Sequence, residues 1–309
     1  MRAPLRDPPF DWAGPSNDPN DEQLGDITDH ISIETASDRT AVFVGEPTDR
    51  AVIGRKGARK GPRALREALA GTKTHQFDRG PIDSLGDLGD VAFESTHSVT
   101  DRQKLAAEIA TMLYESETRP VFLGGDNSMT VGNVRPLLER GSVGVISLDA
   151  HLDCRAGNPS SGTPYRQLFE DGLETYAVVG ARSFENSTAY AEYAREHGTI
   201  VTAESIRQDL EGAIERVESA MADVEQVFLS VDLDVVTAAA APGVSAPTPG
   251  GLSTRELFAL LERFATVDRL AGIEVVECAP ALDAGDRTAI VGARAIAHVV
   301  SQWTSGETQ

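Results

Sequence analysis

Cysteine, lysine and long hydrophobic runs are all scarce in this 309-residue sequence. The two cysteines, Cys154 and Cys278, are too few for a disulfide framework and lack Cys-x-x-Cys spacing, as is typical of a reducing compartment. No run of about 18 apolar residues and no apolar secretion segment is present. We therefore expect a cytoplasmic protein with no membrane partner.

Lysine is the rarer basic residue by far. Only four of the 28 basic residues are lysines, and 48 acidic residues bring the formal net charge to −20. An acidic, lysine-poor surface keeps a protein hydrated at very high salt, where screening leaves little self-repulsion. This favours a halophilic source; an acidic mesophilic protein is the alternative. No basic footprint exists for nucleic acid, so a nucleic-acid partner is not predicted.

Short apolar runs alternate with amphipathic stretches from residue 40 onward. We predict strands at 40–45, 120–123, 143–148, 175–179, 226–231 and 270–276. We predict helices at 63–70, 101–117, 131–140, 189–197, 206–221, 254–265 and 288–303. Such alternation predicts an α/β three-layer sandwich with a mainly parallel central sheet.

The first 38 residues differ from the rest in composition. They are rich in proline, aspartate and asparagine and have little periodicity. We expect residues 1–38 to form an extended or partly disordered N-terminal arm. Residues 39–309 are expected to form a single domain, since no linker or repeat divides them.

Polar side chains follow four of the predicted strands. They are Asn127, Asp149, His151, Asp153, Asp232, Asp234 and Glu277. In parallel α/β sheets the carboxyl ends of the strands meet at one edge, where ligands bind. So many carboxylates would repel one another unless cations neutralised them. A chance histidine in a solvated turn is the alternative for 149–153 alone; the second pair of aspartates favours a two-metal centre that activates water.

Two loops are further candidates. The segment 53–62 is rich in glycine and carries four basic residues, Arg55, Lys56, Arg59 and Lys60. These could bind an anionic substrate group, or pair with acidic surface or another subunit. The loop 155–165 is long for a compact domain, and such loops are usually functional.

These motifs resemble those of the ureohydrolase family, which contains arginase, agmatinase and formimidoylglutamase. The matches are Gly-Gly-Asp-Asn-Ser at 124–128, Asp-Ala-His-Leu-Asp at 149–153, Ser-Val-Asp-Leu-Asp-Val at 230–235 and the loop at 57–62. They span roughly residues 40 to 300. The resemblance implies an arginase/deacetylase-like fold and a homo-oligomer.

The resemblance also implies two Mn²⁺ ions in each subunit. Asp149 and Asp232 would bridge the ions. Asn127 stands where most of the family has a metal-ligating histidine, and an uncharged amide oxygen is the weaker ligand. We therefore expect the first metal to bind loosely. The full implied ligand set is Asn127, Asp149, His151, Asp153, Asp232 and Asp234.

Within the family, the pattern is most similar to formimidoylglutamase. Arg155 stands where arginase would carry asparagine, and Ser-Ser-Gly-Thr-Pro at 160–164 and Ala-Pro-Gly-Val-Ser-Ala-Pro at 241–247 look like the formimidoylglutamase pattern. The resemblance implies hydrolysis of N-formimidoyl-L-glutamate to L-glutamate and formamide, a step of histidine degradation.

The candidate roles fit this small-molecule substrate. Glu277 can accept hydrogen bonds from a planar amidinium, and Asp153 can pass a proton to the leaving amine. His151 completes the catalytic set. Arg155, Ser161 and Arg182 are the candidates to bind the rest of the substrate, although either arginine could instead be a structural partner of an aspartate.

Three other functions stay open at this point. Agmatinase or another amidinohydrolase would use the same metal centre. A degenerate family member could act as a non-catalytic binding or regulatory subunit. A deacetylase of related architecture would use a single zinc and would not need both paired motifs.

Overall fold

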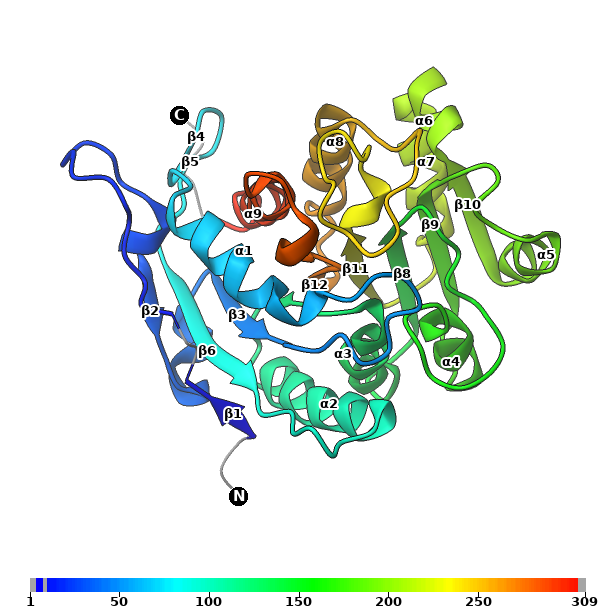
Figure 1. The fold of residues 1–309 in the computed structure, drawn as a ribbon, viewed down its shortest axis with the longest axis horizontal. Helices are drawn as coiled ribbons and strands as arrows, with labels where there is room; N and C mark the ends of the chain where they lie inside the picture. The colour runs from blue at the N-terminus through cyan, green and yellow to red at the C-terminus, as the bar shows by residue number, and fades with distance from the viewer. Residues whose placement is uncertain (1–3, 8–9, 305–309) are drawn as a thin grey trace.

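The centre of the protein is a twisted, mainly parallel sheet (Figure 1). The computed structural model describes residues 4–7 and 10–304. The strands of the sheet are β1 (Leu5–Arg6), β2 (Thr28–His30), β3 (Ala41–Gly45), β6 (Leu85–Val91), β7 (Pro120–Leu123), β8 (Val143–Leu148), β9 (Thr175–Ala181), β10 (Gly198–Thr202), β11 (Gln226–Asp232) and β12 (Leu270–Val276). Two further short strands, β4 (His75–Gln76) and β5 (Gly80–Pro81), form a separate hairpin.

The strand order is β1-β6-β3-β7-β12-β11-β8-β9-β10, with β2 also beside β6. Among the described residues, β1 alone runs antiparallel to its neighbour in this sheet. The four strands β7, β12, β11 and β8 are adjacent in the middle. This is the region where the predicted site residues emerge.

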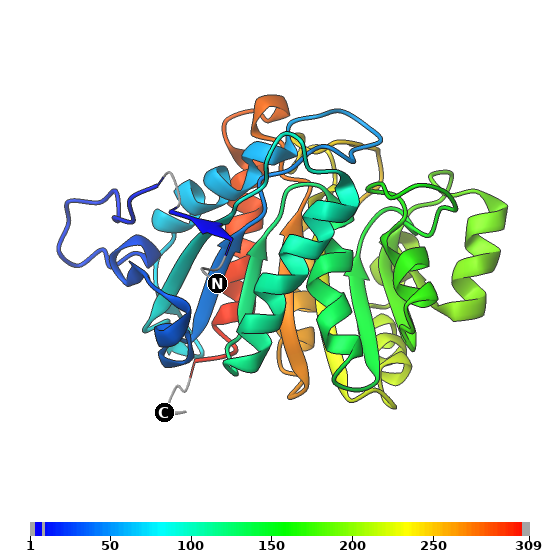
Figure 2. The ribbon, with the colours of Figure 1, turned by 90° about the horizontal axis from the view of Figure 1, so that it is seen from below.

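Helices cover both faces of the sheet, as Figure 2 shows edge-on. One face packs against α1 (Gly61–Ala70), α6 (Ala203–Gln208), α7 (Leu210–Ala220), α8 (Thr254–Phe264) and α9 (Arg287–Val300). The other packs against α2 (Val99–Glu115), α3 (Thr130–Leu138), α4 (Pro164–Glu170) and α5 (Thr188–His197). The predicted three-layer α/β sandwich is confirmed. No helix in the described part of the chain has the length and apolarity needed to cross a membrane.

The central strands are mostly apolar because each faces a hydrophobic core on both sides. In β8, Val143 and Val145 belong to the core beneath α2 to α5, whereas Ile146 and Leu148 belong to the other. Side chains alternate between the faces of a strand, so a strand buried on both faces needs an unbroken apolar run. This is why the predicted central strands were recognisable in the sequence.

Several elements differ from the sequence-based predictions. β6 reads Leu-Gly-Asp-Leu-Gly-Asp-Val, and its glycines and aspartates resemble a turn. The predicted helix at 206–221 is interrupted at Asp209, whose carboxylate accepts a hydrogen bond from Gly212 N and caps α7. The predicted loop at 155–165 ends earlier than expected, because α4 begins at Pro164.

The described residues of the expected N-terminal arm lie against the sheet. β1 and β2 both pair with β6. The Trp12 ring stacks on Phe43 with a centroid distance of 5.7 Å, and its indole N–H donates to Asp87 over 2.8 Å. The division of the chain into an arm and one domain stays a prediction.

An arginine inside the fold joins α1 to β6. Arg66 has no exposed surface and donates to both oxygens of Asp87 over 2.8 and 2.9 Å. It also donates to Asp90 over 2.7 Å. Removing one partner of a buried ion pair leaves the other charge uncompensated, which is strongly destabilising.

We therefore expect Arg66→Ala to lower the free energy of unfolding by about 3–5 kcal/mol. Arg63→Ala on the same helix is the control, because the one ion pair of Arg63 within residues 4–7 and 10–304 is with exposed Glu67, a contact worth about 0.5 kcal/mol or less. Urea denaturation of both variants measures the difference. If both variants lost the same free energy of unfolding, the buried ion pair would stabilise the fold no more than the exposed one.

Candidate metal centre

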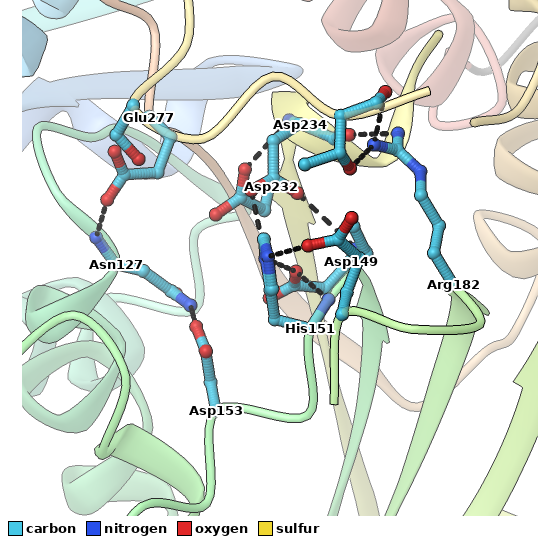
Figure 3. A network of polar contacts seen from close by, with 12 residues as sticks. Asn127, Asp149, His151, Asp153, Arg182, Asp232, Asp234 and Glu277 are labelled. Atoms are coloured by element: carbon cyan, nitrogen blue, oxygen red, sulfur yellow. Dashed lines mark hydrogen bonds and ion pairs between the residues drawn. The ribbon is translucent and has the colours of Figure 1, made fainter. Parts of the chain in front are cut away.

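The polar residues predicted from the strand ends meet at the carboxyl edge of four adjacent strands. Asn127 follows β7, Glu277 follows β12, Asp232 ends β11, and Asp149 follows β8. Asp234 lies in the 3₁₀ helix η5 (Leu233–Val235) directly after β11. Figure 3 shows their side chains pointing toward one another. The topology thus brings together residues more than a hundred positions apart.

The turn after β7 depends on glycine and on a buried aspartate. A Cβ atom on Gly125 would lie 2.0 Å from the Thr48 carbonyl oxygen, which leaves room only for glycine. Asp126 is fully buried and accepts hydrogen bonds from Ala51 N over 3.0 Å and from Ser128 N over 3.1 Å. These contacts fix the turn so that Asn127 faces the site.

Three of the predicted ligands form a compact cluster. His151 Nδ1 lies 3.0 Å from Asp234 Oδ2 and 3.4 Å from Asp149 Oδ1. One donor atom from each of these three residues lies within 4.8 Å of the others. Bonds of about 2.1 Å meeting at right angles would place neighbouring donor atoms about 3.0 Å apart. The cluster therefore has the dimensions of half of a metal coordination sphere.

The electrostatics of the cluster favour a cation. Burial raises the pKa of Asp149 well above its usual range, and the charges of Asp153 and Asp234 raise it further. Burial disfavours a charged His151, yet hydrogen bonding to Asp149 and Asp234 outweighs burial and raises the imidazole pKa to about 12. The negative surroundings thus hold a proton on His151 strongly when nothing else supplies positive charge.

Asp149 also has an oxygen that the protein leaves without a partner. Its Oδ1 accepts a hydrogen bond from His151 N over 2.7 Å, whereas Oδ2 is buried and has no hydrogen-bond partner among the described residues. Buried carboxylate oxygens normally have a donor or a cation. Oxygen-rich donors with one imidazole suit manganese, so the residues fit the metal that the resemblance implies.

A second group of side chains lies across the site from this cluster. Asn127 Nδ2 donates to Asp153 Oδ2 over 2.6 Å, and Asn127 N donates to Glu277 Oε1 over 3.1 Å. Asp153 and Glu277 have φ angles of 40° and 63°. Side chains other than glycine rarely adopt this left-handed region, and such strain concentrates at functional sites.

Burial affects the two carboxyl groups of this second group as well. It raises the pKa of Asp153 to about 6 and that of Glu277 well above its usual range. Glu277 Oε2 is a further buried oxygen without a partner in the described structure. Both carboxylates therefore favour a cationic or hydrogen-bond-donating ligand.

A cavity of about 140 Å³ opens onto the centre. His151, Asp153, Asp232, Asp234 and Glu277 form its polar side. Its remaining wall comes from three loops and contains Ile53, Gly54, Arg155, Ser161, Gly162, Ser245 and Ala246.

Arg155 and Ser161 line this cavity as expected for substrate-binding candidates. Arg155 is exposed, and its guanidinium lies 5.6 Å from the centre of the Tyr190 ring. No carboxylate in the described structure lies within ion-pair distance of this guanidinium. Ser161 is buried, and its hydroxyl accepts a hydrogen bond from Ile53 N over 3.2 Å.

Arg182 lies elsewhere, and this corrects its expected role. Its side chain is 4% exposed and does not line the cavity. The guanidinium donates to the carbonyl oxygens of Asp234, Val236 and Thr248. Both terminal nitrogens of its guanidinium donate to the loop after β11, so Arg182 contacts the backbone of Asp234 and not the cavity.

The basic segment 53–62 also lies outside this cavity, apart from Ile53 and Gly54. Arg55 donates to the Val244 carbonyl over 2.8 Å and so ties this segment to the loop that carries Ser245. None of the four basic residues in the segment lines the described cavity. Their expected role in binding an anionic substrate group is not supported by this placement.

Four residues near the centre were not predicted from the sequence. Ser245 lines the cavity, and Glu185 lies 3.9 Å from His151 Nε2. Thr130 and Glu274 form a buried hydrogen bond of 2.6 Å beneath Asn127. A buried glutamate inside an apolar strand is the one sequence signal that pointed to this lower layer.

Comparison with known proteins places the chain in a family. The sequence profile of the arginase family matches residues 39–301. This chain belongs to the arginase family. A similar arginase-family protein is formimidoylglutamase of Halobacterium salinarum, which is 50% identical over 299 residues, covering 94% of this chain and 97% of that protein.

Two solved arginase-family structures are also similar. Formimidoylglutamase of Bacillus subtilis superposes with a TM-score of 0.88 at 28% identity, covering 95% of each chain. Formiminoglutamase of Trypanosoma cruzi, determined with Mn²⁺, superposes with a TM-score of 0.82 at 26% identity, covering 93% of this chain and 100% of that one. The family relation and the ligand cluster together support a manganese-type centre in this hydrolase fold.

Manganese is expected to stabilise the protein through this centre. A ligand that binds the folded state alone, at 100 times its dissociation constant, adds about 2.7 kcal/mol to the free energy of unfolding. Asp149→Asn should abolish most of this gain, because it removes a charged ligand. Without metal, the same variant should be no less stable than the original protein, because a buried, repelled carboxylate is gone.

Thermal unfolding of metal-free and Mn²⁺-loaded protein tests both statements. Asp171→Asn is the control, because Asp171 pairs with Arg135 far from the cluster. An unchanged manganese effect in Asp149→Asn would remove Asp149 from the ligand set.

Proposed function

We propose that this protein hydrolyses N-formimidoyl-L-glutamate to L-glutamate and formamide, as a step of histidine degradation. The observation that carries the proposal is the presence, in one cavity, of a buried carboxylate with one oxygen unpartnered among the described residues and of an exposed arginine. Glu277 matches the amidinium end of such a substrate, and Arg155 matches its carboxylate end. The similarity to proteins named formimidoylglutamase supports the same substrate.

The proposed cofactor is a pair of Mn²⁺ ions held by Asn127, Asp149, His151, Asp153, Asp232 and Asp234. Bound there, they would supply a water nucleophile that deprotonates near neutral pH, together with Lewis-acid stabilisation. His151 belongs to the catalytic set as a ligand, since Nδ1 faces Asp149 and Asp234.

The remaining steps, which are substrate binding and proton transfer, fall to side chains of the protein. Glu277 Oε2 accepts hydrogen bonds from the planar N–H groups of the formimidoyl unit and orients its carbon toward the centre. Asp153, whose pKa is raised by burial to about 6, takes up the proton of the attacking water and passes it to the leaving amine nitrogen. Arg155, with Ser161 beside it, binds the glutamate carboxylates. Arg182 is a positioning residue behind Asp234.

The competing functions are less well supported by the cavity. Agmatine carries an amine where formimidoylglutamate carries carboxylates, and Arg155 would repel it. A non-catalytic binding subunit would not need carboxylates that are buried and close together, two of which have an oxygen without a partner among the described residues. The predictions of a homo-oligomer, a cytoplasmic location and a halophilic source stay predictions.

The function is tested by assaying Mn²⁺-loaded protein at high salt with three substrates offered separately. We expect glutamate from formimidoylglutamate, with no putrescine from agmatine and no ornithine from arginine. Asp232→Ala, which removes a proposed bridging ligand, should abolish turnover. Turnover of agmatine would change the substrate assignment, and no turnover of any of the three would favour the non-catalytic alternative.

Arg155→Met tests how the substrate's carboxylates are recognised. Losing a charge-assisted hydrogen bond costs about 1.5–3 kcal/mol, so we expect KM for formimidoylglutamate to rise by roughly tenfold to a hundredfold. The effect on kcat should be smaller, because the reacting carbon is bound at the other end of the cavity. Arg59→Met, on a neighbouring loop but outside the cavity, is the control. Equal KM values for the two variants would contradict this role.

A further inference from the structure

Asn127 is the one amide side chain among the proposed metal ligands. Its amide presents an acceptor oxygen and a donor nitrogen of nearly equal size, and exchanging them changes the hydrogen-bond pattern but hardly the shape. Only the oxygen can bind a metal. The surroundings of Asn127 therefore decide whether the first metal finds a ligand there.

The contact between Asn127 and Thr130 is the deciding one. Thr130 Oγ1 lies 2.8 Å from Asn127 Oδ1, 2.8 Å from the Asn127 carbonyl oxygen and 2.6 Å from Glu274 Oε1. A hydroxyl has a single proton to donate. It cannot donate fully to three acceptor oxygens at once, so one of them receives the Thr130 proton and the other two do not.

Glu274 is the preferred acceptor of the Thr130 hydroxyl proton. It is fully buried, its oxygen is the nearest of the three, and a hydrogen bond to a carboxylate is stronger than one to a backbone or amide carbonyl oxygen. Its other oxygen accepts a hydrogen bond from Asn133 Nδ2 over 2.9 Å. The orientation of Asn133 is fixed in turn, because the same amide nitrogen donates to Glu46 over 3.0 Å. With its proton donated to Glu274, the Thr130 hydroxyl can only accept a hydrogen bond from Asn127.

We propose that Thr130, with its hydroxyl held by Glu274, is a positioning residue that turns the Asn127 amide oxygen toward the metal centre. When Thr130 donates to Glu274, it accepts from Asn127 Nδ2. The amide oxygen then faces Asp153, whose Oδ2 lies 2.6 Å from the amide atom on that side. Two oxygens at this separation repel unless a cation lies beside both, and a metal ion bound by both supplies it.

The structure describes the opposite orientation of the amide. There Asn127 Nδ2 donates to Asp153, and the amide oxygen is left against Thr130. The two orientations of the amide thus exchange one unfavourable oxygen pair for another. Thr130 and Glu274 bias this exchange toward the loaded state. The inference rests on the proposed metal centre, but not on the identity of the substrate.

Thr130→Val tests the inference through metal binding itself. The change keeps the shape of the side chain and removes the hydroxyl. Outer residues that orient metal ligands typically contribute 10–100-fold to metal affinity. We expect calorimetric titration with Mn²⁺ to show the weaker of two sites losing at least tenfold in affinity, with the tighter site changed less than threefold. Electron paramagnetic resonance should show fewer spin-coupled manganese pairs at equal metal concentration.

Two further variants separate positioning from general damage. Thr130→Ser restores the hydroxyl and should restore the affinity. Thr118→Val removes another buried threonine hydroxyl, bonded to the Leu113 carbonyl over 3.1 Å, and should change neither site. Equal or tighter manganese binding by folded Thr130→Val would overturn the proposal, as expected if Glu274 carried a proton and donated it to Thr130.

The same titration keeps this inference apart from the proposed function. A protein that fails to hydrolyse formimidoylglutamate but loses its weaker manganese site in Thr130→Val refutes the substrate and supports the positioning role. A protein that hydrolyses formimidoylglutamate with unchanged manganese affinity in Thr130→Val does the reverse.

Discussion

Repulsion among buried carboxylates is the constraint on which the rest of this structure depends. Asp149, Asp232 and Asp234 are each no more than 3% exposed, and burial together with the neighbouring negative charges raises the pKa values of Asp149 and Asp232. Charged groups in such surroundings are costly unless a cation or several hydrogen bonds compensate them. The metal centre is thus the condition under which these carboxylates can stay ionised together.

The fold reduces this cost with backbone dipoles before any metal binds. Asp149 accepts from His151 N, Asp232 accepts from Asp234 N over 2.8 Å, and Asp234 accepts from Ala150 N. These donors are available because a parallel sheet ends all four strands at one edge, where the backbone N–H groups of the following turns are free. Arg182 adds a positive charge near the cluster. Its guanidinium donates to the carbonyl oxygens of Asp234 and Val236 and so does not take the place of a metal ligand.

The sequence predicted the parts of the fold that are buried on both faces and the parts of the site that follow them. β8 and β11 are mostly apolar, and aspartates stand at or just after the end of each, so both the strands and the candidate ligands could be predicted. β6 was missed because Asp87, which pairs with a buried arginine, reads as a turn residue. Arg182 was misplaced because a sequence does not tell whether an arginine beside a site donates to a substrate or to carbonyl oxygens.

Glu274 shows why the deeper layer of the site was harder to predict. It lies inside β12, and its role depends on Thr130 and Asn133 from another strand–helix unit. The layer is costly, since Glu46 Oε1 and Asn133 Oδ1 are buried with no partner in the described structure, and each such atom costs about 1–3 kcal/mol. An apolar core would avoid that cost.

A histidine ligand would place a ring nitrogen at the metal and need little beneath it, whereas an asparagine ligand needs neighbours that distinguish oxygen from nitrogen. In the proposed centre, the polar layer under Asn127 supplies that distinction, and this role accounts for a layer that the stability of the fold does not explain.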